Sequence, residues 1–245
     1  MRVLVVSDVH GNIEALRAVV RAEPDVAHVV CLGDLVDYGP APDQAVAWVR
    51  AHALATVRGN HDNAVAFDED CRSAPLFRRL SVETRAKTVP ILAPENLAFL
   101  RSLPTRRTVH VDDTRLELLH AAPADPLFQY LPATRVEEWR KAAAVIDADL
   151  ILVGHTHLPV IVDLGGKRMV NPGSVGLPRD GDPRACYAVL EDGEPMLRRV
   201  AYDVERTIAA LQAWGLPEDV TRTLEHLYRG GEPLSPFAGS PTQGS

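Results

Sequence analysis

Hydrophobic residues along the chain gather in short runs rich in β-branched side chains, and a Gly or polar residue follows each run. Five such runs are Val3–Val6, Val29–Leu32, Ala55–Val57, Leu116–Leu119 and Leu150–Val153. Runs of this length and composition, bounded by Gly and Asp, predict buried β-strands.

Between the first three runs the apolar positions change to helical spacing. Asn12 is a candidate cap for a helix with Ile13, Leu16 and Val19 on one face, and Pro42 is expected to begin a second helix. Strands that alternate with helices favour a mainly parallel sheet.

The segment from about 65 to 103 has helical patterning, with predicted pieces at 75–80, 82–89 and 96–100. It lies between two polar motifs. Two placements stay open for this segment: it covers the mouth of a site, or it packs against the flank of the sheet.

The rest of the chain predicts a hairpin, a helix and further strands. The hairpin joins 107–111 to 116–119, and the helix covers 133–144. Later strands are predicted at 160–163, 168–170 and 185–190. These late strands look antiparallel, which suggests a second sheet stacked on the first. We expect one α/β domain over 1–230 that ends in a helical hairpin at 203–228, followed by a flexible Gly/Pro/Ser-rich tail at 231–245.

Composition and charge restrict the possible partners. The chain has 245 residues, of which 46% are hydrophobic and 24% charged, and a net charge of −7. An acidic balance disfavours a nucleic-acid polymer as partner. A small phosphorylated substrate remains compatible, because bound metal ions can reverse the local sign of the field.

Cysteine usage and hydropathy bear on the compartment. Cys31, Cys71 and Cys186 show neither metal-site nor redox spacing, which favours a reducing environment. The N-terminal residues do not resemble a signal peptide, and no run approaches the roughly 20 apolar residues of a membrane span. We therefore expect a cytoplasmic protein without a membrane partner; its oligomeric state is left open.

Polar residues that can bind metals follow each of the five predicted strands. They are Asp8-Val9-His10, Gly33-Asp34, Gly59-Asn60-His61-Asp62, His120 and Gly154-His155-Thr156-His157. Loops at the carboxyl ends of strands in an open α/β sheet converge on one crevice. These donors are therefore expected to meet in space.

The donor types suit a pair of divalent ions. Carboxylates and imidazoles bind Mn²⁺, Fe²⁺ or Zn²⁺, and two ions about 3.5–4 Å apart need a shared ligand, usually a carboxylate. The seven candidate ligands are Asp8, His10, Asp34, Asn60, His120, His155 and His157. Two such ions with a bridging hydroxide keep a net positive charge, so they attract phosphate and need no Ser or Cys nucleophile.

In their order and spacing, these segments resemble the five-part signature of the calcineurin-like metallophosphoesterase superfamily. Residues 171–176 and 178–179 resemble its compact bacterial and archaeal phosphodiesterase branch, and the similarity extends over residues 1 to about 180. The resemblance implies a four-layer α/β/β/α sandwich, in which two stacked mixed sheets are flanked by helices.

The resemblance also implies a role for each candidate. Asp34 would bridge the two metals. One metal would take Asp8, His10 and His157, and the other Asn60, His120 and His155. His61 would stabilise a phosphoryl oxygen or protonate the leaving alcohol, and Asp37 would orient and charge His61. In the related Ser/Thr phosphatases an Arg that grips phosphate follows this Asp, whereas this chain has Tyr38, which favours a small-molecule ester over a phosphoprotein.

Several other residues keep two interpretations. Arg58 and Arg179 either contact the substrate anion or are exposed structural residues. Asn171 and Ser174 either line the site or serve a tight turn, and Asp62 either supports the ligands or belongs to a turn.

The predicted activity is metal-dependent hydrolysis of phosphate esters, with small-molecule phosphodiesters as the expected substrates and a hydroxide that bridges the two metals as nucleophile. We expect Mn²⁺ as the metal; Fe, Zn or Ni are the alternatives. A phosphomonoesterase or a dinucleoside polyphosphate hydrolase stays open. A non-catalytic scaffold of this fold is disfavoured because His61 is retained, and a nuclease is disfavoured by the acidic balance.

Overall fold

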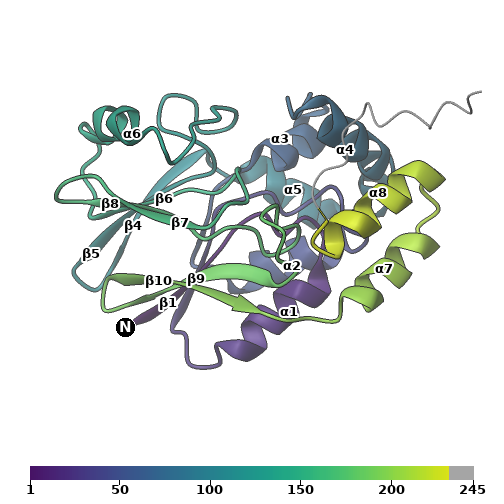
Figure 1. The fold of residues 1–245 in the computed structure, drawn as a ribbon, viewed down its shortest axis with the longest axis horizontal. Coiled ribbons are helices and arrows are strands. Elements are labelled where there is room, and N and C mark those ends of the chain that lie inside the picture. Colours follow the sequence, from purple (N-terminus) through teal and green to yellow (C-terminus); the bar gives the residue numbers. More distant parts are fainter. Residues whose placement is uncertain (232–245) are drawn as a thin grey trace, which may run out of the picture.

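Two five-stranded β-sheets form the centre of the protein (Figure 1), whose computed structural model describes residues 1–231. The first sheet has the strand order β10-β9-β1-β2-β3 and the second the order β4-β5-β6-β8-β7. The first sheet contains β1 (Arg2–Val6), β2 (His28–Cys31), β3 (Ala55–Thr56), β9 (Ala185–Glu191) and β10 (Glu194–Val200). The second contains β4 (Arg106–Val111), β5 (Thr114–Leu119), β6 (Leu150–Leu152), β7 (Val160–Asp163) and β8 (Arg168–Asn171).

Both sheets are mixed, which confirms the predicted fold class. In the first sheet β1, β2 and β3 are parallel, and β9 runs antiparallel to both β1 and β10. In the second, β6 lies parallel to β5 and β8, while β4 and β7 are antiparallel edges. The parallel pairing expected for the first three strands is confirmed, and the chain returns after β8 to add an antiparallel strand, β9, beside β1.

The alternation of side chains along the strands explains why the sheets stack. On β1, Val3 and Val5 point into the layer between the sheets, where they pack with Leu118 of β5. Leu4 and Val6 point the other way. Because successive side chains of a strand point to opposite faces, both faces of β1 are buried.

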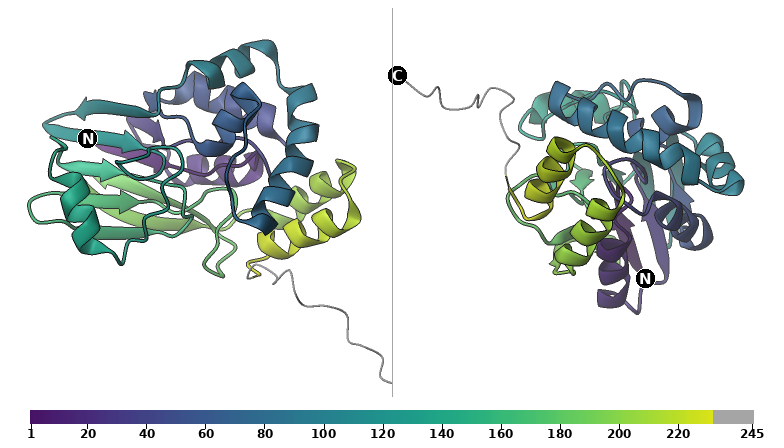
Figure 2. Two further views of the ribbon diagram at one scale, coloured as in Figure 1. Left: turned by 90° about the horizontal axis from the view of Figure 1, so that it is seen from above. Right: turned by 90° about the vertical axis from the view of Figure 1, so that its right-hand side faces the viewer.

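Helices cover the two outer faces (Figures 1 and 2). Helices α1 (Ile13–Ala22) and α2 (Pro42–His52) pack on the first sheet, and α6 (Val136–Ala143) packs on the second through Trp139. These are the four layers of the predicted sandwich. The predicted helix at 133–144 begins later, at Val136.

The remaining helices lie beside the ends of the sheets. They are α3 (Asn60–Phe67), α4 (Pro75–Thr88), the short 3₁₀ helix η1 (Val89–Ile91), α5 (Pro94–Ser102), α7 (Val204–Ala213) and α8 (Glu218–Tyr228). Helix α4 unites the predicted pieces 75–80 and 82–89, because Ser81 between them is buried and its hydroxyl donates to the Arg78 carbonyl. Helix α3 begins at Asn60 rather than near 65, because the Asp62 carboxylate accepts from the Gly59 N–H and caps its first turn.

One predicted pairing is wrong. The late strands do not all join the second sheet, because β9 and β10 pair with β1 in the first. Six of the seven residues of β9 are buried, so β9 suits an interior position in a sheet. Its sequence does not distinguish between the two sheets. The predicted helical hairpin at 203–228 is present as α7 and α8. Apart from Gly231, the predicted tail 231–245 lies outside the described residues. No helix within 1–231 combines the length and apolar character of a membrane span.

Candidate metal centre and active site

The candidate ligands meet at the carboxyl ends of four strands and at the start of α3. Five of the seven have left-handed backbone, with φ between 46° and 66°: Asp8, His10, Asp34, His155 and His157. This conformation is strained for residues other than Gly and persists where the surrounding structure fixes it. At His155 and His157 it turns the backbone twice, so that two side chains separated by one residue face the same crevice.

The first donor group consists of Asp8, His10 and His157. Asp8 Oδ1 lies 3.3 Å from His157 Nε2 and 3.9 Å from His10 Nε2. The two Nε2 atoms are 3.2 Å apart, and all three side chains are buried. This convergence of one carboxylate and two imidazoles has the donor types of a divalent metal site.

The hydrogen bonds of these histidines fix their tautomers. His10 Nδ1 lies 2.8 Å from the Val36 carbonyl, and His157 Nδ1 lies 2.6 Å from the Leu177 carbonyl. A carbonyl only accepts, so each Nδ1 carries the hydrogen and each Nε2 presents a lone pair. Burial lowers the pKa of His10 well below its usual range and also lowers that of His157, so both are neutral. Two lone pairs at 3.2 Å, beside an Asp8 Oδ1 that lacks a hydrogen-bond donor among residues 1–231, fit a cation between them.

The second donor group consists of Asp34, Asn60, His120 and His155. Asn60 Oδ1 lies 3.0 Å from His120 Nε2 and 3.1 Å from His155 Nδ1. The Asn60 amide nitrogen donates to the Cys71 carbonyl at 2.7 Å, which turns the amide oxygen toward the imidazoles. His120 Nδ1 donates to the Leu32 carbonyl, so its Nε2 also faces the group. Burial lowers the pKa of His155 to about 3, which keeps this imidazole neutral.

Asp34 of the second group also lies close to the first group. Its Oδ2 is 3.2 Å from His120 Nε2 and 3.8 Å from His10 Nε2, the position that a shared ligand needs. Burial opposes its ionisation, yet the neighbouring histidines hold the pKa of Asp34 well below its usual range. A Cβ at Gly59 would lie 2.0 Å from Asp34 Oδ1, so only Gly allows this approach. Asp62 accepts from the backbone N–H groups of both Asp34 and Gly59, and therefore clamps the two loops together.

His61 forms a relay with two charged side chains. Its Nδ1 lies 2.8 Å from Asp37 Oδ2, and the Arg85 guanidinium donates to the same oxygen at 2.6 Å. Burial lowers the pKa of His61, but the carboxylates of Asp34 and Asp37 outweigh it and raise the pKa. Arg85 was not predicted from the sequence, because it lies on α4, forty-eight residues from Asp37, without any motif around it.

The other ring nitrogen of His61, Nε2, faces a cleft of about 330 Å³ beside both donor groups. Its Nε2 is 3.2 Å from the Tyr38 hydroxyl and 3.3 Å from Ser73 Oγ. Tyr38, the residue after Asp37, is fully buried. It presents a hydroxyl to His61 at the position where the related Ser/Thr phosphatases have a positively charged Arg. Arg179 lines the cleft, with its guanidinium 3.8 Å from the Phe77 ring centre.

The other open candidates have clear positions. Arg58 lies outside the lining of the cleft: its guanidinium stacks 4.7 Å from the Phe67 ring centre. Arg72, which the sequence did not single out, lines the cleft instead. Asn171 donates to the Gly154 carbonyl and the Ser174 hydroxyl donates to the Asp8 carbonyl, so both hold ligand-bearing loops rather than face the metals.

The helical segment 65–103 takes part in both placements considered from the sequence. Residues 72–74 and Phe77 at the start of α4 line the cleft. Helix α5 packs instead against α2 and α3, at the flank of the first sheet.

The profile of the calcineurin-like phosphoesterase superfamily domain matches residues 1–193. The chain is 31% identical to an uncharacterized protein of Methanocaldococcus jannaschii over 88% of this chain and 94% of that protein. It is 28% identical to phosphodiesterase YfcE of Escherichia coli, over 78% and 88%. Among solved structures, a metallophosphoesterase from Sphaerobacter thermophilus is similar with a TM-score of 0.75 and 34% identity, over 91% and 98%.

Proposed function

Since the chain belongs to the calcineurin-like phosphoesterase superfamily, we propose that it hydrolyses phosphodiesters of small molecules with the help of two divalent metal ions. The observation that carries the proposal is the placement of Asp34 in one convergent donor group and close to the other. The similarity to a protein named as a phosphodiesterase supports a diester as substrate. We also propose a cytoplasmic location, because all three cysteines are buried and free.

The residues present fit a pair of metal ions. Asp8, His10 and His157 would hold one ion and Asn60, His120 and His155 the other, with Asp34 shared by both. We propose Mn²⁺ as the metal; Fe, Zn and Ni suit the same donors. Such ions, when bound, would lower the pKa of a water molecule so that it supplies hydroxide, and would offset the negative charge of the phosphoryl oxygens.

The chain's own groups would handle the substrate and the proton. Arg179 places a positive charge at the cleft and attracts the phosphate anion. His61, whose pKa is raised by Asp34 and Asp37, directs its Nε2 into the cleft and would donate a proton to the leaving alcohol oxygen. Arg85 holds Asp37 in place, because it donates to the oxygen that contacts His61.

Metal-stripped protein tests the proposal. We expect hydrolysis of bis-p-nitrophenyl phosphate only after Mn²⁺ is restored, and a loss of at least 100-fold in kcat for Asp34→Asn. The exposed Asp25→Asn serves as the matched control and should keep the wild-type rate. Equal rates with and without metal would overturn the proposal. Faster hydrolysis of p-nitrophenyl phosphate or of diadenosine tetraphosphate would replace the diester by a monoester or a dinucleoside polyphosphate.

A further inference from the structure

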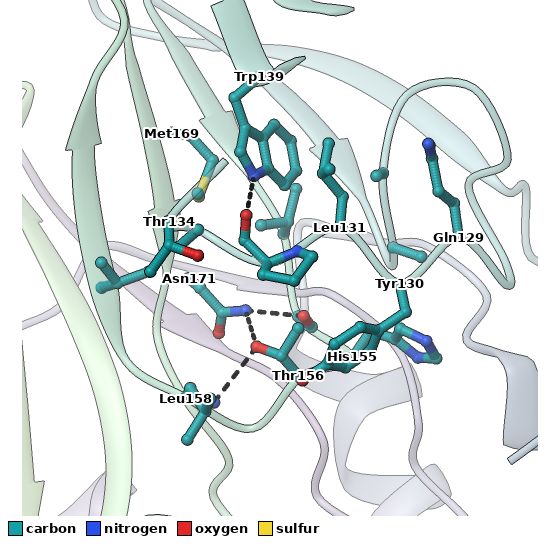
Figure 3. A pocket seen from close by; sticks show the side chains of 17 residues that line it. Gln129, Tyr130, Leu131, Thr134, Trp139, His155, Thr156, Leu158, Met169 and Asn171 are labelled. Carbon is teal, nitrogen blue, oxygen red and sulfur yellow. Dashed lines mark hydrogen bonds between the residues drawn. The ribbon is translucent and has the colours of Figure 1, made fainter. Parts of the chain in front are cut away.

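A second cavity, of about 260 Å³, lies next to the metal cleft (Figure 3). Residues 129–134 form one wall, and the segment after β6 (153–158), Met169 and Asn171 of β8, and Trp139 of α6 form the others. Leu131, Trp139 and Met169 are almost completely buried beneath it, and Leu158 lies at its edge with 42% of its surface exposed. Its lining is therefore mostly carbon.

The loop after β6 separates this cavity from the metal cleft. His155 and His157 line the cleft, whereas Thr156 and Leu158 line the apolar cavity. His155 and Tyr130 border both spaces, with their ring centres 6.1 Å apart. The partition is therefore only one ring thick. A group attached to a phosphorus atom at the second donor group would reach the cavity by way of His155 and Tyr130, which line both spaces.

Three polar side chains in the cavity wall, Trp139, Asn171 and Thr156, already have partners within the protein. The Trp139 indole N–H donates to the Pro132 carbonyl, and the Asn171 amide donates to the Thr156 hydroxyl at 3.0 Å (Figure 3). The Thr156 oxygen also accepts from the Leu158 N–H. A sugar or nucleobase that entered here would lose hydrogen bonds to water and would find these three groups already engaged, whereas a hydrocarbon group has no hydrogen bonds to lose.

We propose that this cavity binds an uncharged apolar group of the substrate, an aryl or branched alkyl ester substituent on the phosphorus. The inference rests on the proposed phosphodiesterase function and adds the class of alcohol that the enzyme accepts. A cavity of roughly 150 Å³ is enough for benzene, so the observed space takes one substituted ring. The same space is small for a complete drug-sized ligand of the kind found in pockets of about 300–1,000 Å³.

Two diesters with the same leaving group and the same charge test the inference. Phenyl p-nitrophenyl phosphate and methyl p-nitrophenyl phosphate are compared on the Mn²⁺-loaded protein, each rate divided by its rate in hydroxide alone. We expect kcat/KM to favour the phenyl ester by roughly 10-fold or more. Leu158→Gln and the cavity-filling Ala133→Phe should lower this preference toward one. Leu197→Gln changes a Leu of similar exposure on β10, outside the cavity, and should keep the preference.

Binding is measured separately from turnover. Diphenyl phosphate should shift the indole N–H resonance of Trp139, and dimethyl phosphate should not. The resonances of Trp48 and Trp214, whose side chains lie outside the cavity, serve as internal references. They also show whether each variant is folded.

The possible results separate the two proposals. Hydrolysis of the methyl ester without any preference for phenyl overturns the apolar subsite and leaves the phosphodiesterase function standing. A preference for the p-nitrophenyl ester of thymidine 5′-phosphate over the phenyl ester also overturns it, because the group selected would then carry hydrogen-bonding edges. Failure to hydrolyse any diester with any metal overturns the proposed function itself.

Discussion

Replacement of Arg85 by Met tests the relay behind His61. Arg85 and His61 both contact Asp37 Oδ2, at 2.6 and 2.8 Å, so two positive groups share one carboxylate oxygen. Two unit charges about 5 Å apart interact by about 3 kcal/mol at an effective dielectric constant of about 20, which corresponds to about 2 pH units. Because 13% of the Arg85 side chain is exposed, water screens part of this interaction. We therefore expect the pKa of His61 to shift by about half of this amount.

The direction of the shift in the pKa of His61 distinguishes the loss of a nearby positive charge from a general disruption of the active site. Loss of a neighbouring cation makes it easier for His61 to keep its proton, so the alkaline limb of the pH–kcat profile should move upward by about 1 unit. The maximum of kcat should fall, because Asp37 has lost the donor that fixes its position. Stability should fall by about 1–3 kcal/mol, as expected when a buried charge loses a partner.

The assay is the pH dependence of kcat for wild type, Arg85→Met and Arg79→Met. Arg79 lies on the same helix, is 57% exposed and pairs with Asp219, so it controls for the loss of one positive charge on α4. An alkaline limb that stays in place or moves downward in Arg85→Met would refute the relay. A similar upward shift in Arg79→Met would assign the effect to net charge.

Three further predictions concern the metals and acid stability. Gly59→Ala should lower the metal content from two ions toward one, measured by elemental analysis, because the new Cβ would lie 2.0 Å from Asp34 Oδ1. Removal of metal by a chelator should lower the free energy of unfolding by about 2.7 kcal/mol for each bound ion if the ions were present at 100 times their Kd, measured by urea denaturation with and without Mn²⁺. Burial opposes ionisation of Glu23, but hydrogen bonds from Arg198, Tyr187 and Arg2 hold its pKa below the usual 4.5. Its stabilisation is therefore complete above about pH 4.5 and lost as pH falls through the lower folded-state pKa, so wild type should exceed Glu23→Gln in stability at pH 7 and lose this advantage in strong acid.

The strands and ligands that the sequence predicted correctly are determined by short, contiguous stretches of the chain. Strands such as Val3–Val6 are visible because one short run combines β-branched residues with a polar end. The ligands are visible because each follows such a run, and strand ends gather at one edge of a sheet. The position of Asp34 close to both donor groups follows from these two regularities together.

The parts that the sequence did not predict depend on contacts between distant segments. Arg85 is one of several arginines on a helix, and only the packing of α4 brings it to Asp37. The pairing of β9 with β1 is likewise a choice between two sheets that its buried, apolar sequence suits equally. One wall of the apolar cavity consists of residues 129–134, which belong to no helix or strand. Their hydrophobic pattern has no regular period from which the cavity could be predicted.

The left-handed backbone at Asp8, His10, Asp34, His155 and His157 has a consequence for protein engineering. Gly or Asn would relieve conformational strain at each of these positions, by an amount on the order of 1 kcal/mol. Selection for heat resistance in the absence of metal would therefore enrich Gly in these turns, and each such replacement would remove a metal-binding side chain. A thermostability screen on this protein should therefore include turnover as a second criterion, because the replacements that relieve strain at these positions would also abolish activity.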